Sequence, residues 1–238
     1  MKRLATILFI PAFAFGMLVS CGGGGKEYAD ESEDSSEATE EMAAEEAPVY
    51  SGETAVGVVH SVADFGVWKE AYEKVSNPDG RIAIYENVDN PGEIVVFELT
   101  TSHADSKAMF SSSEMKEDME NAGVTSEPVI TYYDMKYMNS EDTDARYRVA
   151  IQHEVSDYAA WRTIFDDDES RRTEAGLELR GLATDPDNAN LVFMVFSTDD
   201  LEGVKSMLND PDLKAKMEEA GVISEAIVTY WQNPGDSN

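Results

Sequence analysis

The feature of this 238-residue chain that most limits its fold is an internal duplication. The segment His60–Trp68 returns as His153–Trp161, with the histidine, a valine, an aspartate, an aromatic residue and the tryptophan in the same places. The segment Ala122–Glu127 returns in the same way as Ala220–Glu225. A duplicated supersecondary unit normally buries its apolar face against its copy. This symmetry therefore predicts the architecture more directly than any single motif does.

The first 20 residues have the layout of a secretory signal peptide. Lys2 and Arg3 precede an apolar run over residues 4–19, and Ser20 precedes Cys21. The run is shorter than the ~20 apolar residues of a membrane span. The sequence Leu-Val-Ser-Cys that ends at Cys21 resembles the lipobox of bacterial lipoproteins, which implies that this cysteine is lipidated. It is the only cysteine, so no disulfide can form within one chain, and a free thiol is the alternative.

Residues 21–50 are predicted to form a disordered, lipidated tether. Residues 26–50 contain ten acids and one base, and large apolar side chains are nearly absent. Such a segment cannot build a core, and its like charges repel and extend it. Lys26, Glu27 and the acids after them resemble the export signal of some Bacteroidetes lipoproteins, with a plain solvated spacer as the alternative. These features predict a bacterial outer membrane lipoprotein, either periplasmic or surface-exposed.

The formal net charge of −30 limits the possible partners. A surface this acidic repels phosphate backbones, so nucleic acid is not expected as a partner. Anionic lipid headgroups are not attracted either. We therefore expect the membrane contact to run through the lipid on Cys21 alone.

The two repeats are predicted to span residues 51–140 and 145–233, with the same order of elements in each. That order is strand, helix, strand, strand, helix, strand. We expect the first repeat to place strands at 54–60, 81–85, 94–99 and 129–133, and its second helix at 104–122. The corresponding elements of the second repeat are strands at 147–153, 177–183, 191–196 and 227–231, and a helix at 201–220. Asp64 and Asp157 are expected to cap the first helices, and Gly123 and Gly221 to end the second ones.

This order is that of a ferredoxin-like unit, an α+β arrangement with two helices on one sheet face. A second copy can cover the other face, so the tandem βαββαβ repeats predict a pseudo-dimeric α/β barrel. With its His-x-Val-x-Asp-aromatic-x-x-Trp opening and Glu-x-Ala-Gly-Val close, the repeat resembles the dimeric alpha-beta barrel superfamily over about residues 54–232. That superfamily includes antibiotic biosynthesis monooxygenase-like domains. Two units packed side by side are the alternative architecture.

His60 and His153 are the candidate catalytic residues, because two of the three histidines occupy equivalent positions at the end of a first strand. An imidazole there can act as a general base or polar anchor. The alternative is that each histidine ties its strand end to the helix that follows. No metal site is predicted, because no His/Cys cluster is present and the acidic sets 166–169 and 185–187 lack the spacing of a calcium loop.

Four aromatic residues of the last strands are candidate ligand-binding residues. Tyr132 and Tyr133 are neighbours in the first repeat, and Tyr230 and Trp231 are neighbours in the second. Because side chains alternate along a strand, one of each pair must face the barrel interior. The helical aromatic stripes that contain Trp68 and Trp161 are expected to belong to the core instead.

The sequence contains no serine triad, catalytic cysteine or glycine-rich phosphate loop. Together with the tether, this predicts a lipid-anchored envelope or surface binding protein without a cofactor. Its partner would be a small, partly apolar molecule or a surface protein. The superfamily resemblance implies an alternative, a cofactor-independent monooxygenase-like enzyme. Such an enzyme would bind a small aromatic or planar substrate between sheet and helices, with His60 or His153 as the base.

We expect the protein extracted from bacterial membranes to begin at Cys21 and to carry a diacylglyceryl adduct on that residue, because the cleavage site and the cysteine adjoin each other. Mass spectrometry of the extracted protein measures both features. A mature protein whose mass lacks the adduct would contradict the lipid anchor.

Overall fold

The computed structural model describes residues 53–75, 81–141 and 143–234, so the predicted signal peptide, Cys21 and the tether lie outside the described residues. The first repeat contains β1 (Thr54–Ser61), α1 (Phe65–Val75), β2 (Arg81–Asn87), β3 (Glu93–Thr100), α2 (His103–Ser111), α3 (Ser113–Asn121) and β4 (Val129–Met138). The second contains β5 (Tyr147–Glu154), α4 (Tyr158–Asp167), α5 (Glu169–Glu174), β6 (Glu178–Thr184), β7 (Leu191–Thr198), α6 (Leu201–Leu208), α7 (Pro211–Glu219) and β8 (Ile227–Gln232). Over these described ranges, no helix has both the length and the apolar character needed to cross a bilayer.

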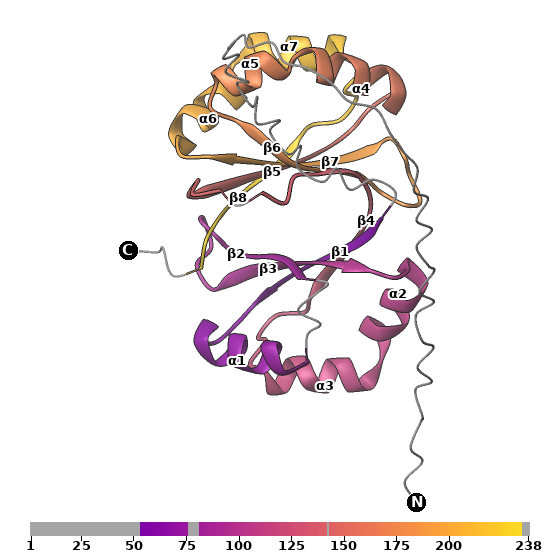
Figure 1. Cartoon of the computed structure of the whole chain (residues 1–238), viewed down its shortest axis with the longest axis vertical. Helices are drawn as coiled ribbons and strands as arrows, with labels where there is room; N and C mark the ends of the chain where they lie inside the picture. The colour runs from indigo at the N-terminus through magenta and orange to yellow at the C-terminus, as the bar shows by residue number, and fades with distance from the viewer. Residues whose placement is uncertain (1–52, 76–80, 142, 235–238) are drawn as a thin grey trace, which may run out of the picture. The chain divides into compact units, whose positions relative to one another are not determined.

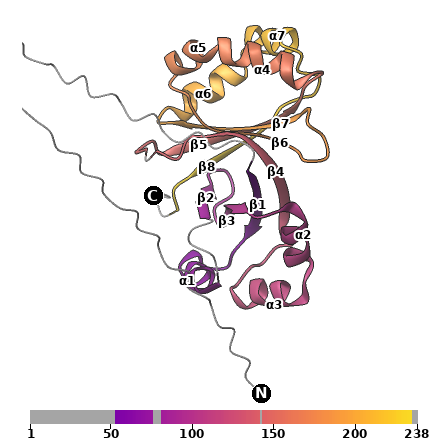
Figure 2. The same ribbon diagram turned by 45° about the vertical axis from the view of Figure 1, so that its right-hand side comes forward.

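The eight strands form one closed barrel in the order β1-β3-β2-β8-β5-β7-β6-β4. The helices of each repeat lie on the outer face of their own strands, and the two sets of strands face each other (Figure 1). The last strand of each repeat pairs with the other repeat. Strand β4 pairs with β6 from Asp134↔Thr184 to Met138↔Gly181, while β8 pairs with β2 only at its end. Figure 2 shows β4 curving from the first set of strands toward the second. The predicted pseudo-dimeric barrel is confirmed, and the side-by-side alternative is wrong.

Side chains from both repeats pack inside the barrel. The ring of Tyr133 on β4 meets the ring of Phe193 on β7 edge to face, with centroids 4.9 Å apart. The buried guanidinium of Arg148 on β5 donates a hydrogen bond of 3.2 Å to the hydroxyl of Tyr85 on β2. Burial raises the pKa of Tyr133 to about 12. The interior is therefore a shared core in which each repeat contacts the other.

Each predicted long second helix is in fact two short helices. In the first repeat, Ser112 has an extended backbone, with ψ at 150°, and its side chain accepts a hydrogen bond from the Met115 amide. In the second repeat, Asp210 caps α7 and Pro211 occupies its first turn. A capping side chain with extended backbone ends one helix and starts another, so the continuous helices over 104–122 and 201–220 were wrong predictions.

The predicted caps at the other helix ends are confirmed. Asp64 Oδ1 accepts a hydrogen bond of 2.9 Å from the Val67 amide, and Asp157 Oδ1 accepts one of 2.8 Å from the Ala160 amide. Gly123 and Gly221 close their helices with φ of 88° and 92°. A side chain with a Cβ rarely adopts this left-handed conformation, which explains the glycines.

The second repeat is longer than the first in one place. His60 pairs with Ile94, and the equivalent His153 pairs with Val192, so five additional residues lie between these positions in the second repeat. The β2–β3 and β6–β7 hairpins have the same length, because Glu86 pairs with Ile94 and Thr184 pairs with Val192 at the same separation along the chain. All five additional residues therefore lie between His153 and Thr184, before the end of β6. The extra length accommodates α5, a helix that the sequence did not predict.

The close contact of Gly57 with Tyr133 and Phe97 inside the barrel predicts that Gly57→Ala destabilises the fold. The added Cβ would lie 2.9 Å from a ring carbon of Tyr133 and 3.1 Å from one of Phe97. Overpacking of this kind costs about 1–3 kcal/mol in the free energy of unfolding, measured by urea denaturation. Gly181→Ala on β6 is the matched control, because its Cβ would meet nothing within 4 Å. Equal losses in the two variants would contradict the packing described here.

Candidate functional site

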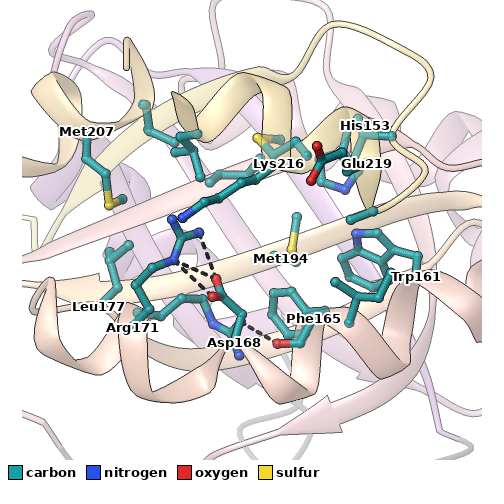
Figure 3. A pocket seen from close by; sticks show the side chains of 18 of the residues that line it. His153, Trp161, Phe165, Asp168, Arg171, Leu177, Met194, Met207, Lys216 and Glu219 are labelled. Atoms are coloured by element: carbon teal, nitrogen blue, oxygen red, sulfur yellow. Dashed lines mark hydrogen bonds and ion pairs between the residues drawn. The ribbon is translucent and has the colours of Figure 1, made fainter. Parts of the chain in front are cut away.

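A cavity of about 560 Å³ lies between the helices and the strands of the second repeat (Figure 3). Ile151 on β5 and Met194 on β7 line it from the sheet, and Trp161 and Phe165 line it from α4. Side chains of α6 and α7, such as Met217, line it from the other helices. A volume of about 300–1,000 Å³ with mostly apolar walls is typical of sites for small organic ligands. The cavity therefore has the size and chemistry to hold a small apolar molecule.

His153 lines this cavity and is almost fully buried, with 4% of its surface exposed. Among the described residues, neither of its ring nitrogens has a hydrogen-bond partner. Its ring meets that of Trp161 edge to face, at a centroid distance of 5.7 Å. Burial lowers the pKa of His153 to about 4, so the imidazole is neutral at neutral pH. A neutral imidazole with an unpartnered nitrogen on a cavity wall can accept a proton or a hydrogen bond from a ligand.

His60 occupies the equivalent place in the first repeat but is not a residue of this cavity. It is also 4% exposed, packs against Trp68 at 5.5 Å, and has no hydrogen-bond partner among the described residues. Burial lowers its pKa to about 4. Neither histidine therefore ties its strand to the following helix through a hydrogen bond, which was the alternative role. The aspartate caps fix those helix starts instead.

The two repeats differ in the side chains beside these histidines. Phe165 and Phe196 line the cavity of the second repeat. The equivalent positions in the first repeat are Tyr72 and Glu98, and the Tyr72 hydroxyl donates a hydrogen bond to the Glu98 carboxylate. A polar pair therefore occupies the place that two apolar rings take in the second repeat. At these two positions, the two copies therefore differ in polarity beside the equivalent histidines.

Charged side chains surround the end of the cavity near α5. Arg171 Nε donates hydrogen bonds of 3.0 and 2.9 Å to the two carboxylate oxygens of Asp168. The guanidinium carbon of Arg172 lies 3.7 Å from the ring centroid of Phe165, and burial lowers the pKa of Arg172. Lys216 from α7 also lines the cavity. Both arginines belong to α5, in the stretch where the second repeat has its five additional residues.

The four predicted ligand-binding aromatics lie elsewhere. Tyr133 and Trp231 face the barrel interior, where Trp231 Nε1 donates a hydrogen bond of 2.8 Å to Thr229. Tyr132 and Tyr230 face the helices, with the Lys107 and Lys205 ammonium groups 5.2 and 4.9 Å from their ring centroids. None of the four is a residue of the cavity. Their contact with a ligand stays a prediction.

The two tryptophans of the helical stripes are each 3% exposed, as expected of core residues. Trp161 packs in the core and also forms part of the cavity wall. This second role of Trp161 was not predicted from the sequence, nor was the presence of Arg171 and Lys216 on the cavity wall. A position-by-position comparison of the two repeats, with attention to the five extra residues, would have identified this region.

The acidic sets make local contacts in the structure. Asp166 pairs with Arg162, and Asp168 pairs with Arg171. Asp185 Oδ1 accepts hydrogen bonds from the amides of Asp187 and Asn188, which stabilises the β6–β7 turn. Within residues 53–75, 81–141 and 143–234, no group of three or more His, Cys, Asp or Glu side chains is arranged to hold a metal ion.

No family model matches this chain. No curated protein matches it either. Among solved structures, it is similar to a candidate monooxygenase from Lactobacillus acidophilus NCFM, with 13% identity, a TM-score of 0.50, and coverage of 75% of this chain and 93% of that one. An anthrone oxidase-like protein is similar at 12% identity and a TM-score of 0.50, over 78% of this chain and 94% of that one. A ferredoxin-fold protein from Listeria monocytogenes, related to antibiotic biosynthesis monooxygenases, shares 10% identity at a TM-score of 0.47, over 77% and 95% of the two chains.

At 13% and 12% identity, the likeness to the first two structures shows the fold alone. Their names nevertheless correct one prediction. The predicted binding function is wrong, because the similar structures are described as oxygenase-like or oxidase-like proteins, whereas the predicted envelope location stays a prediction. The enzyme alternative agrees better with this finding.

The buried histidines predict a specific dependence of stability on pH. Their pKa falls from 6.5 to about 4 on folding, so between these values the unfolded chain binds more protons than the folded one. This contribution to stability is fully present above pH 6.5 and is lost as the pH falls toward 4. Between pH 7 and pH 4, the free energy of unfolding should therefore fall by about 3 kcal/mol less in His153→Phe than in wild type.

Urea denaturation of wild type and His153→Phe at both pH values measures this difference. The carboxylates titrate in both proteins, so their contribution cancels in the comparison. His60→Phe should give a change of similar size, because His60 has the same burial and the same direction of pKa shift. Unchanged pH dependence in both variants would contradict the buried, neutral state of these rings.

Proposed function

We propose that this protein is a cofactor-independent, monooxygenase-like enzyme that oxidises a small planar aromatic substrate in the cavity of the second repeat. The observation on which this rests is the apolar cavity with the unpartnered, neutral imidazole of His153 on its wall. Apolar packing needs no polar nitrogen on the cavity wall, and leaving a buried one without a hydrogen-bond partner costs about 1–3 kcal/mol. A ligand that supplies a hydrogen-bonding or acidic group to His153 would offset this cost.

The cavity walls favour a flat, apolar ligand. Trp161 and Phe165 stack with centroids 4.8 Å apart and an interplanar angle of 25°. The sulfur-containing side chains of Met194, Met207 and Met217 also line the site. Aromatic planes and polarisable thioethers both interact well with aromatic rings. The fold neighbour described as anthrone oxidase-like has a name that fits a substrate of this kind.

His153 would act as the general base. It would take a proton from an activated C–H or phenolic O–H group of the substrate, which leaves an electron-rich carbanion or phenolate. That anion would reduce molecular oxygen directly, so no separate electron donor is needed. For an anthrone-like CH₂ group, one oxygen atom of O₂ would become the new carbonyl and the other would leave as water with the two hydrogens. Substrate and oxygen then balance the products.

The low pKa of His153 determines its protonation state at neutral pH. A base with a pKa of about 4 is already deprotonated at neutral pH, so it needs no activation. The imidazolium formed during the reaction would be stabilised by the adjacent substrate anion. Figure 3 shows Glu219 at the same end of the cavity as His153, where its carboxylate would add to this stabilisation.

We further propose that the enzyme is a lipoprotein of the bacterial outer membrane, held by lipid on Cys21 and separated from the bilayer by the acidic tether. The signal-like residues 1–20 and the position of the single cysteine support this location. The strong negative charge of the chain, −30 over all 238 residues, would keep it away from anionic headgroups.

We expect His153→Phe to lower kcat/KM for oxidation of anthrone by about 10²–10⁴-fold, the usual contribution of a positioned general base. Oxygen consumption by the full-length protein measures the rate. His60→Phe is the matched control, because it changes the same residue in the copy whose histidine lies outside the cavity. For wild type, the base should lose activity only as the pH falls toward 4. Equal activities of the two variants would remove His153 from the mechanism.

A further inference from the structure

Two cations from different helices lie at one end of the cavity. Arg171 belongs to α5 and Lys216 to α7, and both line the site. In Figure 3 the Lys216 side chain extends toward Arg171, while His153, Trp161 and Glu219 lie at the opposite end. Like charges that point toward one another repel, and an anion placed between them relieves the repulsion. Asp167 and Asp168 also line the cavity, and Asp168 pairs with Arg171, so Lys216 is the cation that remains without an ion pair among the described residues. We call the end with Arg171 and Lys216 the cationic end; His153 lies at the other.

The hydrogen bonds of these two groups leave donors available. Asp168 occupies Nε and Nη2 of Arg171, and among the described residues Nη1 has no acceptor. No carboxylate of the described residues lies within 4.0 Å of Lys216 Nζ, although the chain contains 48 acidic residues. An unpaired ammonium and a free guanidinium N–H are the donors that a carboxylate accepts.

The first repeat lacks both cations at equivalent positions. Counted from Gly123 and Gly221, the position of Lys216 corresponds to Asp118, which reverses the charge. Arg171 lies in the stretch that contains the five extra residues. The cationic end therefore occurs together with the apolar rings of Phe165 and Phe196, which replace Tyr72 and Glu98. The histidine and the tryptophan occur in both repeats, whereas the two cations and the two phenylalanines occur at these positions in the second repeat alone.

We propose that the substrate is an aromatic acid, with its carboxylate bound by Lys216 and Arg171 and its oxidisable ring directed toward His153. This inference rests on the proposed function and adds the class of substrate to it. The carboxylate would accept a hydrogen bond from Lys216 Nζ and one from Arg171 Nη1. The apolar walls between the two ends would hold the ring. Binding by the acid group then fixes which end of the molecule meets the base.

The experiment compares naphthoate with naphthamide, its neutral analogue of nearly the same shape, by isothermal titration calorimetry on the full-length protein. We expect wild type to bind naphthoate about tenfold more tightly than naphthamide, in line with a hydrogen bond to a charged group. Lys216→Gln should reduce this preference to about twofold or less. Lys214→Gln is the matched control, because Lys214 is exposed on the same helix and is not a residue of the cavity. Added salt should weaken only the binding of naphthoate.

The outcomes separate this inference from the proposed function. Equal affinity for the two probes, or a preference that Lys216→Gln leaves intact, would overturn the aromatic-acid assignment while the cavity still binds planar molecules. Failure of both probes to bind would overturn the assignment and the proposed substrate site together. Loss of the preference in Lys216→Gln but not in Lys214→Gln would support the assignment even if anthrone is not oxidised.

Discussion

The structure depends on the exchange of last strands between the two repeats. Strand β4 completes the sheet edge at β6, and β8 reaches the edge at β2, so the two half-sheets close into one barrel. An open edge exposes unpaired backbone groups, and closure satisfies them. The exchange also brings Tyr133 against Phe193 and Arg148 against Tyr85, which places side chains of both repeats in one interior. Neither repeat has this core by itself.

Closure also decides where a ligand can bind. Because the inner faces of both sheets serve as a mutual core, space for a small molecule is found between the sheet and the helices of the second repeat. The two copies have diverged there. The first has the polar Tyr72–Glu98 pair, whereas the second has apolar rings and five additional residues in the stretch that contains α5. The duplicated fold thus carries two different sets of side chains beside its two equivalent histidines.

Much of the fold could be predicted from the sequence because the relevant signals are local. Asp64 and Asp157 cap helices through contacts three residues away, and Gly123 and Gly221 end helices through their own φ angles. The breaks at Ser112 and Asp210 also have local signals, but the apolar pattern across them favoured one long helix. For the site, equivalence of the two histidines in the repeats pointed to His153. That His153 lines a cavity and His60 does not depends on side chains distant in the sequence. The equivalence of the two histidines in the repeats could not predict this difference.

By itself, the sequence determined the duplication, the order of elements in each repeat, the fold class and the strong negative charge, because these follow from periodicity, capping residues and composition. Only the tertiary structure decided that the inward aromatics Tyr133 and Trp231 belong to the interior and that His153, unlike His60, lines a cavity. It also brought Arg171 and Lys216 to one end of that cavity. The physical reason is that burial and neighbours of a side chain depend on how helices α4 to α7 pack over the sheet, and no local pattern contains that packing.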